Sequence, residues 1–167
     1  PEILVNIAGI LSNNRLLETS PEEWKRIHEV NLDGPFYLSQ LTVPHMKQQG
    51  WGRIVNICSY AWKSGGMTSG TAYSSSKAGM VGLTFTIAKE VAAFGVTVNG
   101  IAPAYVMSPM VTEQLSDEQR NERLAAIPVR RFSEPDEVAH TVRFLISPLA
   151  AFITGEIIDM NGGFQFD

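Results

Sequence analysis

A tyrosine and a lysine stand four residues apart at Tyr73 and Lys77, a spacing that places both side chains on one face of a helix. A phenol alone titrates near pH 10, which is too high for an acid or base at neutral pH, and a neighbouring ammonium lowers that pKa. The hydroxyl of Ser59 could hydrogen-bond an oxygen on which charge develops. Together these groups would suit proton transfer to or from an alcohol or carbonyl oxygen.

The Tyr73 and Lys77 pair is weak evidence by itself, because an exposed helix often has an incidental tyrosine and lysine at this spacing. Its weight comes from an ordered series along the chain, in which Asn31 and Ser59 precede the pair. Our candidate catalytic residues are therefore Asn31, Ser59, Tyr73 and Lys77.

The composition is that of an ordinary globular protein. Of its 167 residues, 44% are hydrophobic and 18% are charged, which suffices for one domain with its own core. A net charge of -4 and a pI near 5.4 argue against a nucleic-acid surface. The single cysteine, Cys58, excludes an internal disulfide and fits a reducing compartment, so we expect a cytoplasmic protein. We expect no membrane partner and no metal, because no apolar stretch reaches spanning length and the histidines lack ligand spacing.

Apolar runs at residues 3–8, 53–58, 96–102 and 156–160 predict buried β-strands. The runs are nearly continuous, without polar alternation, which is typical of a parallel sheet covered on both faces. Helical segments separate them. This alternation predicts an α/β fold with right-handed crossovers, formed by a single domain over residues 1–167.

Start and stop signals predict the helices between these strands. The first begins at Ser20-Pro21, steps or kinks at Gly34-Pro35 and ends at Gly50. Two more are expected over residues 71–94, ending at Gly95, and residues 133–146. Residues 104–132 are more loosely patterned and polar in their middle. We expect a substrate lid there, although a plain surface helix would show the same pattern.

Several motifs follow one another along the chain: Asn6-Ile7-Ala8-Gly9, Asn31-Leu32-Asp33-Gly34, residues 52–59, Tyr73 with Lys77, residues 99–108 and residues 154–163. Their order and spacing resemble the classical short-chain dehydrogenases/reductases, and among them the 3-oxoacyl-carrier-protein-reductase-like members. The resemblance implies an NAD- or NADP-dependent oxidoreductase that interconverts a secondary alcohol and a ketone. It also implies a Rossmann-like doubly wound parallel sheet with helices on both faces, of which this chain would form the C-terminal two-thirds.

The resemblance assigns a role to each candidate catalytic residue. Tyr73 would be the general acid/base, and Lys77 would lower its pKa and hydrogen-bond the nicotinamide ribose. Ser59 would orient the substrate oxygen, and Asn31 would hold a water of a proton relay. Two structural alternatives stay open: Ser59 as a cap at a strand end, and Asn31 as a kink residue that bonds the backbone near Gly34.

The resemblance also places a dinucleotide at the carboxyl ends of the strands. Its implied contacts are Asn6, Ala8, Gly9, Tyr73, Lys77, Pro103, Val106 and Ser108, with Val106 meeting the nicotinamide amide through its backbone. Asn6 could equally brace two strands. Candidate substrate contacts are Trp62, Met67, Tyr105 and Met110, and each of them could instead belong to the core or the lid packing.

Some family features are missing or changed. The first strands and the glycine-rich phosphate turn have no counterpart, so we expect a fragment of a longer chain with exposed apolar surface. Ala104 replaces a glycine, which would be unfavourable if that position requires a positive φ. The sequence does not choose between NAD and NADP. Alternative functions are a sugar-acid or polyol dehydrogenase of the same family, or a truncated, non-catalytic binding module.

Apolar residues on the predicted helices extend beyond a single stripe, as at Phe36, Leu41 and Phe85. The family pairs the corresponding helices between subunits, so the resemblance implies a homotetramer or a homodimer. Burial of these residues within one chain is the alternative.

Overall fold

The computed structural model describes residues 1–166, without the side chains of Met110, Thr112 and Gln114. Its sheet has four parallel strands in the order β1 (Ile3–Asn6), β2 (Gly52–Ile57), β3 (Val96–Pro103) and β4 (Ile157–Met160). All the predicted strands are therefore confirmed, although the first ends two residues earlier than expected. Parallel pairing places every carboxyl end at one edge of the sheet, where a site can form.

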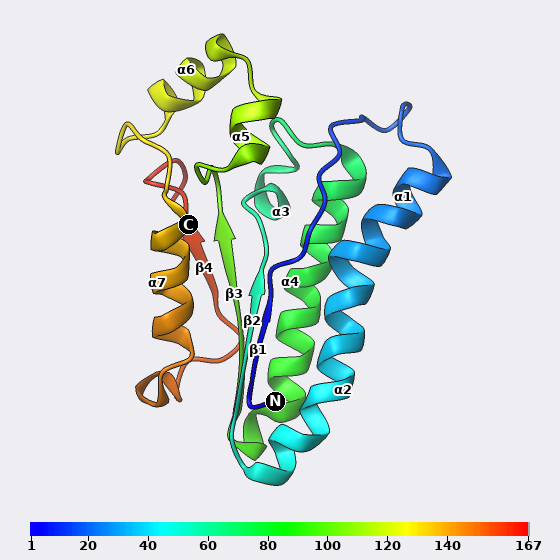
Figure 1. Ribbon diagram of the computed structural model, residues 1–167, viewed down its shortest axis with the longest axis vertical. Helices are drawn as coiled ribbons and strands as arrows, with labels where there is room; N and C mark the ends of the chain where they lie inside the picture. The colour runs from blue at the N-terminus through cyan, green and yellow to red at the C-terminus, as the bar shows by residue number, and fades with distance from the viewer. Residues whose placement is uncertain (167) are drawn as a thin grey trace.

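Helices cover both faces of the sheet, as expected for a doubly wound fold. Figure 1 shows α2 (Gly34–Gln49) and α4 (Thr71–Val91) on one face and α7 (Pro135–Leu145) on the other. Strands β2 and β3 lie between these layers and are almost entirely buried. Their nearly continuous apolar sequence follows from this position, because neither face is open to water.

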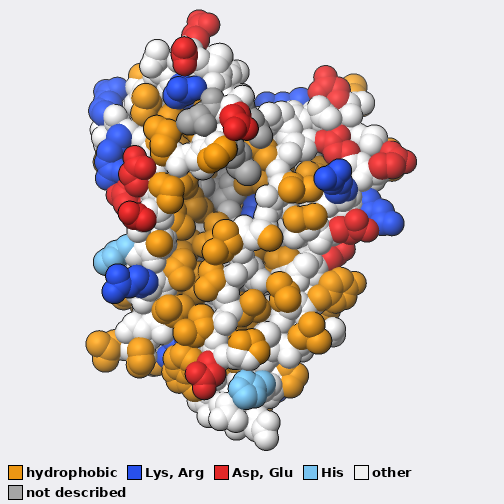
Figure 2. All heavy atoms as spheres, viewed as in Figure 1, with side chains coloured by type: hydrophobic (Ala, Val, Ile, Leu, Met, Phe, Trp, Pro, Cys, Tyr) orange, Lys and Arg blue, Asp and Glu red, His pale blue; other side chains and the backbone are white. Residues whose placement is uncertain are grey.

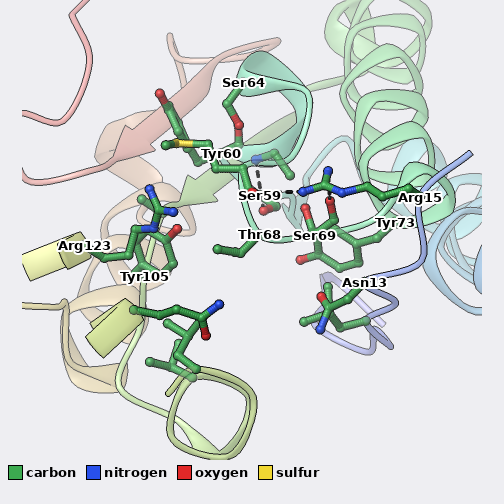
Figure 3. Close-up of a pocket in the computed structure, with 17 residues that line it drawn as sticks. Asn13, Arg15, Ser59, Tyr60, Ser64, Thr68, Ser69, Tyr73, Tyr105 and Arg123 are labelled. Atoms are coloured by element: carbon green, nitrogen blue, oxygen red, sulfur yellow. Dashed lines mark hydrogen bonds between the residues drawn. The ribbon is translucent and has the colours of Figure 1, made fainter. Parts of the chain in front are cut away.

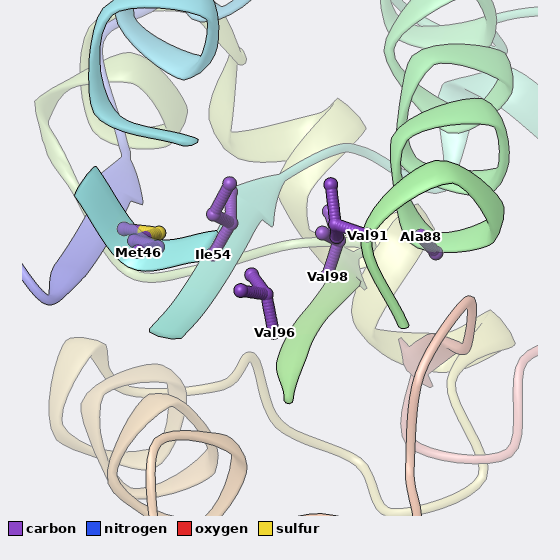
Figure 4. Packing of buried hydrophobic residues seen from close by; sticks show 6 residues of the cluster. All are labelled: Met46, Ile54, Ala88, Val91, Val96 and Val98. Carbon is purple, nitrogen blue, oxygen red and sulfur yellow. The ribbon is translucent and has the colours of Figure 1, made fainter. Parts of the chain in front are cut away.

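Alternate residues of the central strands form separate cores on the two faces. Ile54 and Val98 pack with Ala88 of α4 in the cluster of Figure 4, which also contains Met46, Val91 and Val96. The next residue along β2, Val55, packs on the opposite face with Leu145 of α7. The period-two geometry of a strand explains how adjacent residues serve opposite layers.

The first long helical segment has three parts: α1 (Pro21–His28), a π-helical turn η1 (Glu29–Asp33) and α2. The expected step at Gly34-Pro35 is present, but its cause lies one turn earlier, in η1. The predicted stops are confirmed, since Gly50 and Gly95 both have positive φ. Gly95 follows a 3₁₀ turn, η2 (Ala92–Phe94), and a Cβ there would collide with the carbonyl oxygen of Gly50.

Residues beyond the carboxyl ends of β2 and β3 form smaller helices. The short helix α3 (Ala61–Ser64) was not predicted, whereas α5 (Pro109–Gln114) and α6 (Asp117–Ala126) lie in the loosely patterned segment. Figure 1 shows α5 and α6 above the strand ends. A small core of Val111, Ile127 and Phe132 supports them, and β4 is preceded by a 3₁₀ turn, η3 (Pro148–Ala150).

Strand β1 lies at the edge of the sheet and has a paired neighbour on one side only. Ile3 and Ile7 are 41% and 68% exposed, and Figure 2 shows hydrophobic side chains gathered over this face of the molecule. The expected exposure of apolar surface is thus confirmed. Among the described residues, no helix is long and apolar enough to cross a membrane.

Candidate active site

The candidate catalytic residues come together from three elements at the carboxyl edge of the sheet. Ser59 follows β2, Tyr73 and Lys77 lie in the first two turns of α4, and Asn31 lies in η1. Ser59 and Tyr73 line a pocket of about 310 Å³, and Figure 3 shows them at its centre. This volume is at the small end of the range for ligand sites.

Lys77 is buried beneath the pocket, with 3% of its surface exposed. Its Nζ donates a hydrogen bond to the carbonyl oxygen of Ile57 at 2.7 Å and lies 5.9 Å from the centre of the Tyr73 ring. Burial disfavours the ammonium and lowers the pKa of Lys77 to about 8, although the electrostatic interaction with Cys58 acts in the opposite direction. The side chain therefore remains largely protonated at neutral pH while having a proton that it can release.

The pKa of Tyr73 differs from our expectation, because the structure raises it above 10 and does not lower it. Burial of the phenol is the largest cause of the raised pKa. A hydrogen bond with the Ser59 hydroxyl lowers the pKa, and the electrostatic interaction with Cys58 raises it further. In this structure the tyrosine is thus protonated at neutral pH. It can act as an acid toward an oxygen placed beside Ser59.

Ser59 has the structural role that the sequence left open, and its hydroxyl also faces the pocket. Its Oγ accepts a hydrogen bond from the backbone N–H of Ala61 at 3.2 Å, which caps the turn between β2 and α3. The same hydroxyl lies next to the phenol of Tyr73 and lines the pocket. The cap fixes the position of the hydroxyl, so the structural role supports a chemical one.

Asn31 is completely buried, and both the oxygen and the nitrogen of its side chain have partners within the protein. Its Oδ1 accepts from the N–H of Ile10 at 2.9 Å, while its Nδ2 donates to the Ile10 carbonyl and to Ser76 Oγ, each at 3.0 Å. Ser76 Oγ donates in turn to the carbonyl of Tyr73 at 2.7 Å. The side chain therefore does not make the alternative bond near Gly34, and connects the loop after β1 to α4.

The loop after β1 runs close to Lys77, as a cofactor contact requires. A Cβ on Gly9 would lie 3.4 Å from Lys77 Nζ and 3.5 Å from Asn31 Oδ1, which is ordinary van der Waals contact, so the loop passes directly beside both side chains. Ala8 and Gly9 are exposed. Asn6 is a brace, since its Nδ2 donates to Asn56 Oδ1 at 2.7 Å, but its own Oδ1 is buried without a partner.

The loop after β3 forms the other side of the predicted cofactor site. Pro103 is buried at the strand end, and Val106 and Ser108 are half-buried beyond it. Backbone bonds from Met107 and to Tyr105 join this loop to Ser133 on either side of Val106. Within the described part of the chain, the amide and carbonyl of Val106 itself have no hydrogen-bond partner. This N–H donor and carbonyl acceptor match the acceptor and donor of a ligand's carboxamide group.

Two of the candidate substrate contacts, Met67 and Tyr105, line the pocket. Trp62 does not, because it packs against the buried cluster around Cys58 and Met80. The side chain of Met110 lies outside the described residues. Among the residues that the structure describes, no three His, Cys, Asp or Glu side chains gather as a metal site.

Two arginines on the pocket wall were missed by the sequence interpretation. Arg15 donates to the carbonyl oxygens of Gly66, Met67 and Ser69, which holds the loop before α4 in place. Arg123 reaches the pocket from α6. Neither residue belongs to a motif, and nothing in the local sequence indicates which side of its segment faces the pocket.

Comparison with known proteins gives consistent matches along the whole chain. A family model described as enoyl-(acyl carrier protein) reductase matches residues 1–165. The 3-oxoacyl-[acyl-carrier-protein] reductases FabG of Vibrio cholerae and Aquifex aeolicus are 44% and 43% identical over 162 residues. Each alignment covers 97% of this chain but only 66% and 64% of the relative, so the chain spans about two thirds of their length.

Solved structures agree with this result. A 3-oxoacyl-[acyl-carrier protein] reductase from Brucella melitensis superposes with a TM-score of 0.94 at 31% identity, over 99% of this chain and 63% of that one. A putative NAD(P) dependent gluconate 5-dehydrogenase from Beutenbergia cavernae, with bound NADP, gives 0.92 at 36% identity, over 98% and 66%.

Proposed function

The chain belongs to the short-chain dehydrogenase/reductase family, and on that premise we propose that the protein is an NAD(P)-dependent oxidoreductase. Its reaction would interconvert a secondary alcohol and a ketone. The observation that supports this best is the arrangement of Tyr73, Ser59 and Lys77, which lie together at the carboxyl edge of a parallel sheet. A non-catalytic binding module would have no need for this set.

Tyr73 and Ser59 provide the acid chemistry of the proposed reaction. When bound, the nicotinamide supplies the hydride for reduction and accepts it for oxidation. In the reducing direction, the Ser59 hydroxyl holds the carbonyl oxygen, and Tyr73 donates its phenolic proton to that oxygen as negative charge develops there. The raised pKa of Tyr73 keeps this proton in place until the substrate needs it.

Lys77 provides positive charge beneath the phenol. An ammonium 5.9 Å from the ring stabilises the phenolate that remains after proton transfer, which lowers the barrier to that step. Asn31 acts by position: it ties Ile10 to Ser76 and so sets the distance between the loop after β1 and α4. A water relay through Asn31 would have to use its backbone or the second lone pair of Oδ1, because both side-chain N–H donors are already occupied.

The cofactor would lie across the strand ends, between the loops after β1 and β3. Asn6, Ala8 and Gly9 would contact its adenosine half, and Ala8 and Gly9 are exposed at the strand end. On the nicotinamide side, the contacts would be Tyr73, Lys77, Pro103, Val106 and Ser108. The open backbone groups of Val106 support this assignment, and the chain leaves the choice between NAD and NADP open.

The proposal extends to the substrate, the lid and the assembly. A 3-oxoacyl-thioester reductase and a sugar-acid or polyol dehydrogenase are both compatible with the relatives.

Residues 104–132 would be the substrate lid, since α5 and α6 lie over the pocket that Tyr105 and Val111 line. A homotetramer or homodimer would cover the exposed apolar side chains of α2 and α4. The protein would be located in the cytoplasm.

Replacement of Tyr73 by phenylalanine in the natural full-length protein tests the proposal. The variant loses only the hydroxyl, so the fold should persist while the turnover number falls by roughly 10²–10⁴-fold. Tyr37→Phe is the matched control, because Tyr37 is 57% exposed on α2. Steady-state reduction of ketones with NADH and NADPH measures the effect. A Tyr73→Phe enzyme with a near-normal rate would refute the assignment.

A further inference from the structure

The lid helix α6 places an arginine on the wall of the catalytic pocket. Figure 3 shows Arg123 and Tyr105 on one side of the pocket and Tyr73 on the other, with Ser59 between them. Arg123 is 19% exposed at its side chain. A guanidinium is almost always charged, so a fixed positive charge lies at the end of the pocket opposite the acid/base tyrosine.

Few interactions within the protein offset the burial of the Arg123 guanidinium. Among the described residues it makes no hydrogen bond, and its Nε is buried without a partner. Within the described part of the chain, its ion pair is with the adjacent Glu122, whose carboxylate lies 3.8 Å from the terminal nitrogen and whose side chain is 68% exposed. Such a distance is too long for a hydrogen bond, and a pair so open to water contributes little. A largely buried guanidinium with such a weak partner is unfavourable unless another group binds to it.

Two other arginines of this region have hydrogen bonds that Arg123 lacks. Arg15 lines the same pocket but donates to three backbone carbonyls, so its guanidinium already has a structural use. Arg120 lies one turn earlier on α6, donates to the carbonyl of Leu115 and pairs with Asp117 at 3.5 Å. It does not line the pocket.

We infer that Arg123 pairs with a carboxylate of the substrate, which makes the natural substrate a small keto acid or hydroxy acid. This inference rests on the proposed function and selects between its two substrate classes. A carboxylate can accept two hydrogen bonds from the planar guanidinium, so binding would satisfy the buried donors. It would also orient the substrate, with the acid group at α6 and the carbonyl carbon toward Ser59 and Tyr73. A pocket of about 310 Å³ suits a molecule of this size.

The test compares Arg123→Met with the natural full-length protein on paired substrates. Straight-chain keto acids from acetoacetate to 5-oxohexanoate are each assayed beside the corresponding neutral primary amide, and the acetoacetyl thioester of N-acetylcysteamine represents the acyl-thioester class. Methionine keeps the apolar stem and removes the charge. We expect kcat/KM for the best keto acid to fall by roughly 10–100-fold, mainly through KM, with the amide and thioester nearly unchanged.

Two further variants separate charge recognition from a structural role. Arg120→Met removes an equivalent charge from the same helix and should leave the ratio of acid to amide unchanged. Arg123→Lys keeps the charge without the planar fork and should recover part of the preference for the acid. The inference is overturned if Arg123→Met lowers acid and amide activity equally, or if the natural protein prefers the thioester and the variant does not change that preference.

A binding measurement keeps this inference separate from the proposed reaction. Calorimetric titration of Tyr73→Phe with the same acids and amides, in the presence of NAD(P)⁺, needs no turnover. Tighter binding of an acid than of its amide, lost on adding Arg123→Met, supports the carboxylate site even where the panel is not reduced. Equal binding of the two rejects it. The proposed function is judged independently, by whether Tyr73→Phe abolishes reduction of whichever ketone the natural protein accepts.

Discussion

At the scale of single residues, burial governs the protons of the site, because it raises the pKa of Tyr73 and lowers the pKa of Lys77 to about 8. The helical spacing of Tyr73 and Lys77 and the strand-end position of Ser59 were sufficient to predict a shared site. The direction of the Tyr73 pKa shift was not predictable, because it depends on how far the phenol is buried and on the nearby Cys58. A sequence shows neighbours along a helix, whereas burial comes from packing by distant elements.

Lys77 provides a test of this electrostatic picture. Its folded pKa of about 8 is below the unfolded value of about 10.4, so between these values the unfolded chain binds more protons. The burial cost is fully present below pH 8, and stability rises as the pH increases from 8 toward 10.4. Lys77→Met removes the cost but loses the bond to Ile57. We expect it to stabilise the cofactor-free protein by about 1–3 kcal/mol at pH 7.

The stabilisation should shrink steadily when urea unfolding is repeated at pH 8, 9 and 10. Lys89→Met, at an exposed site near the end of the same helix, should change stability little at any of these pH values. A gain that is constant with pH would show that packing, and not the buried charge, is responsible. Activity should fall strongly in Lys77→Met alone.

At the scale of elements, start and stop signals predicted the strands and long helices well, because apolar runs and glycine stops act locally. The four residues of α3 were too short to leave a pattern. For the π-helical turn η1, the sequence predicted only a kink near Gly34. Asn31, within this turn, bonds to the distant residues Ile10 and Ser76, and a local sequence pattern does not show such bonds. Ala104 causes no strain, because the one described non-glycine residue with positive φ is Arg130.

Asn31 joins three elements, and its replacement should loosen their arrangement. Asn31→Ala leaves both backbone groups of Ile10 without their buried partner, so we expect a loss of about 2–4 kcal/mol in unfolding free energy. Hydrogen exchange at the Ile10 amide should accelerate before global unfolding. Ser76→Ala removes only one of the Asn31 bonds and should have a smaller effect. Unchanged exchange at Ile10 in Asn31→Ala would contradict the positioning role.

At the scale of the whole molecule, the pocket and the exposed surfaces depend on contacts that no local pattern encodes. The general site was predictable because parallel strands end at one edge. The inward direction of Arg123 was not, since α6 has a polar sequence and its orientation is set by the small core around Phe132. Similarly, the sequence predicted apolar residues on α2 and α4, but only the structure shows that Leu41 remains 76% exposed.

The exposed apolar side chains of α2 and α4 lead to a prediction about assembly. Leu41 and Phe85 are 76% and 47% exposed, which is unfavourable for an isolated surface but suits a subunit interface. A glutamate at each site would bring uncompensated charge into that interface. We therefore expect Leu41→Glu/Phe85→Glu to weaken association of the natural protein by at least roughly 100-fold. Light scattering after size-exclusion chromatography would then give the monomer mass.

Gln48→Glu is the control for added charge, because Gln48 is an exposed polar residue near the end of α2. It should leave the mass of the assembly unchanged. If the double variant also keeps the assembled mass, the subunits associate through another surface, and if the natural protein is itself a monomer, no subunit covers these helices. Either result would reject the proposed interface while leaving the chemistry of Tyr73 untouched, because that site is formed within one chain.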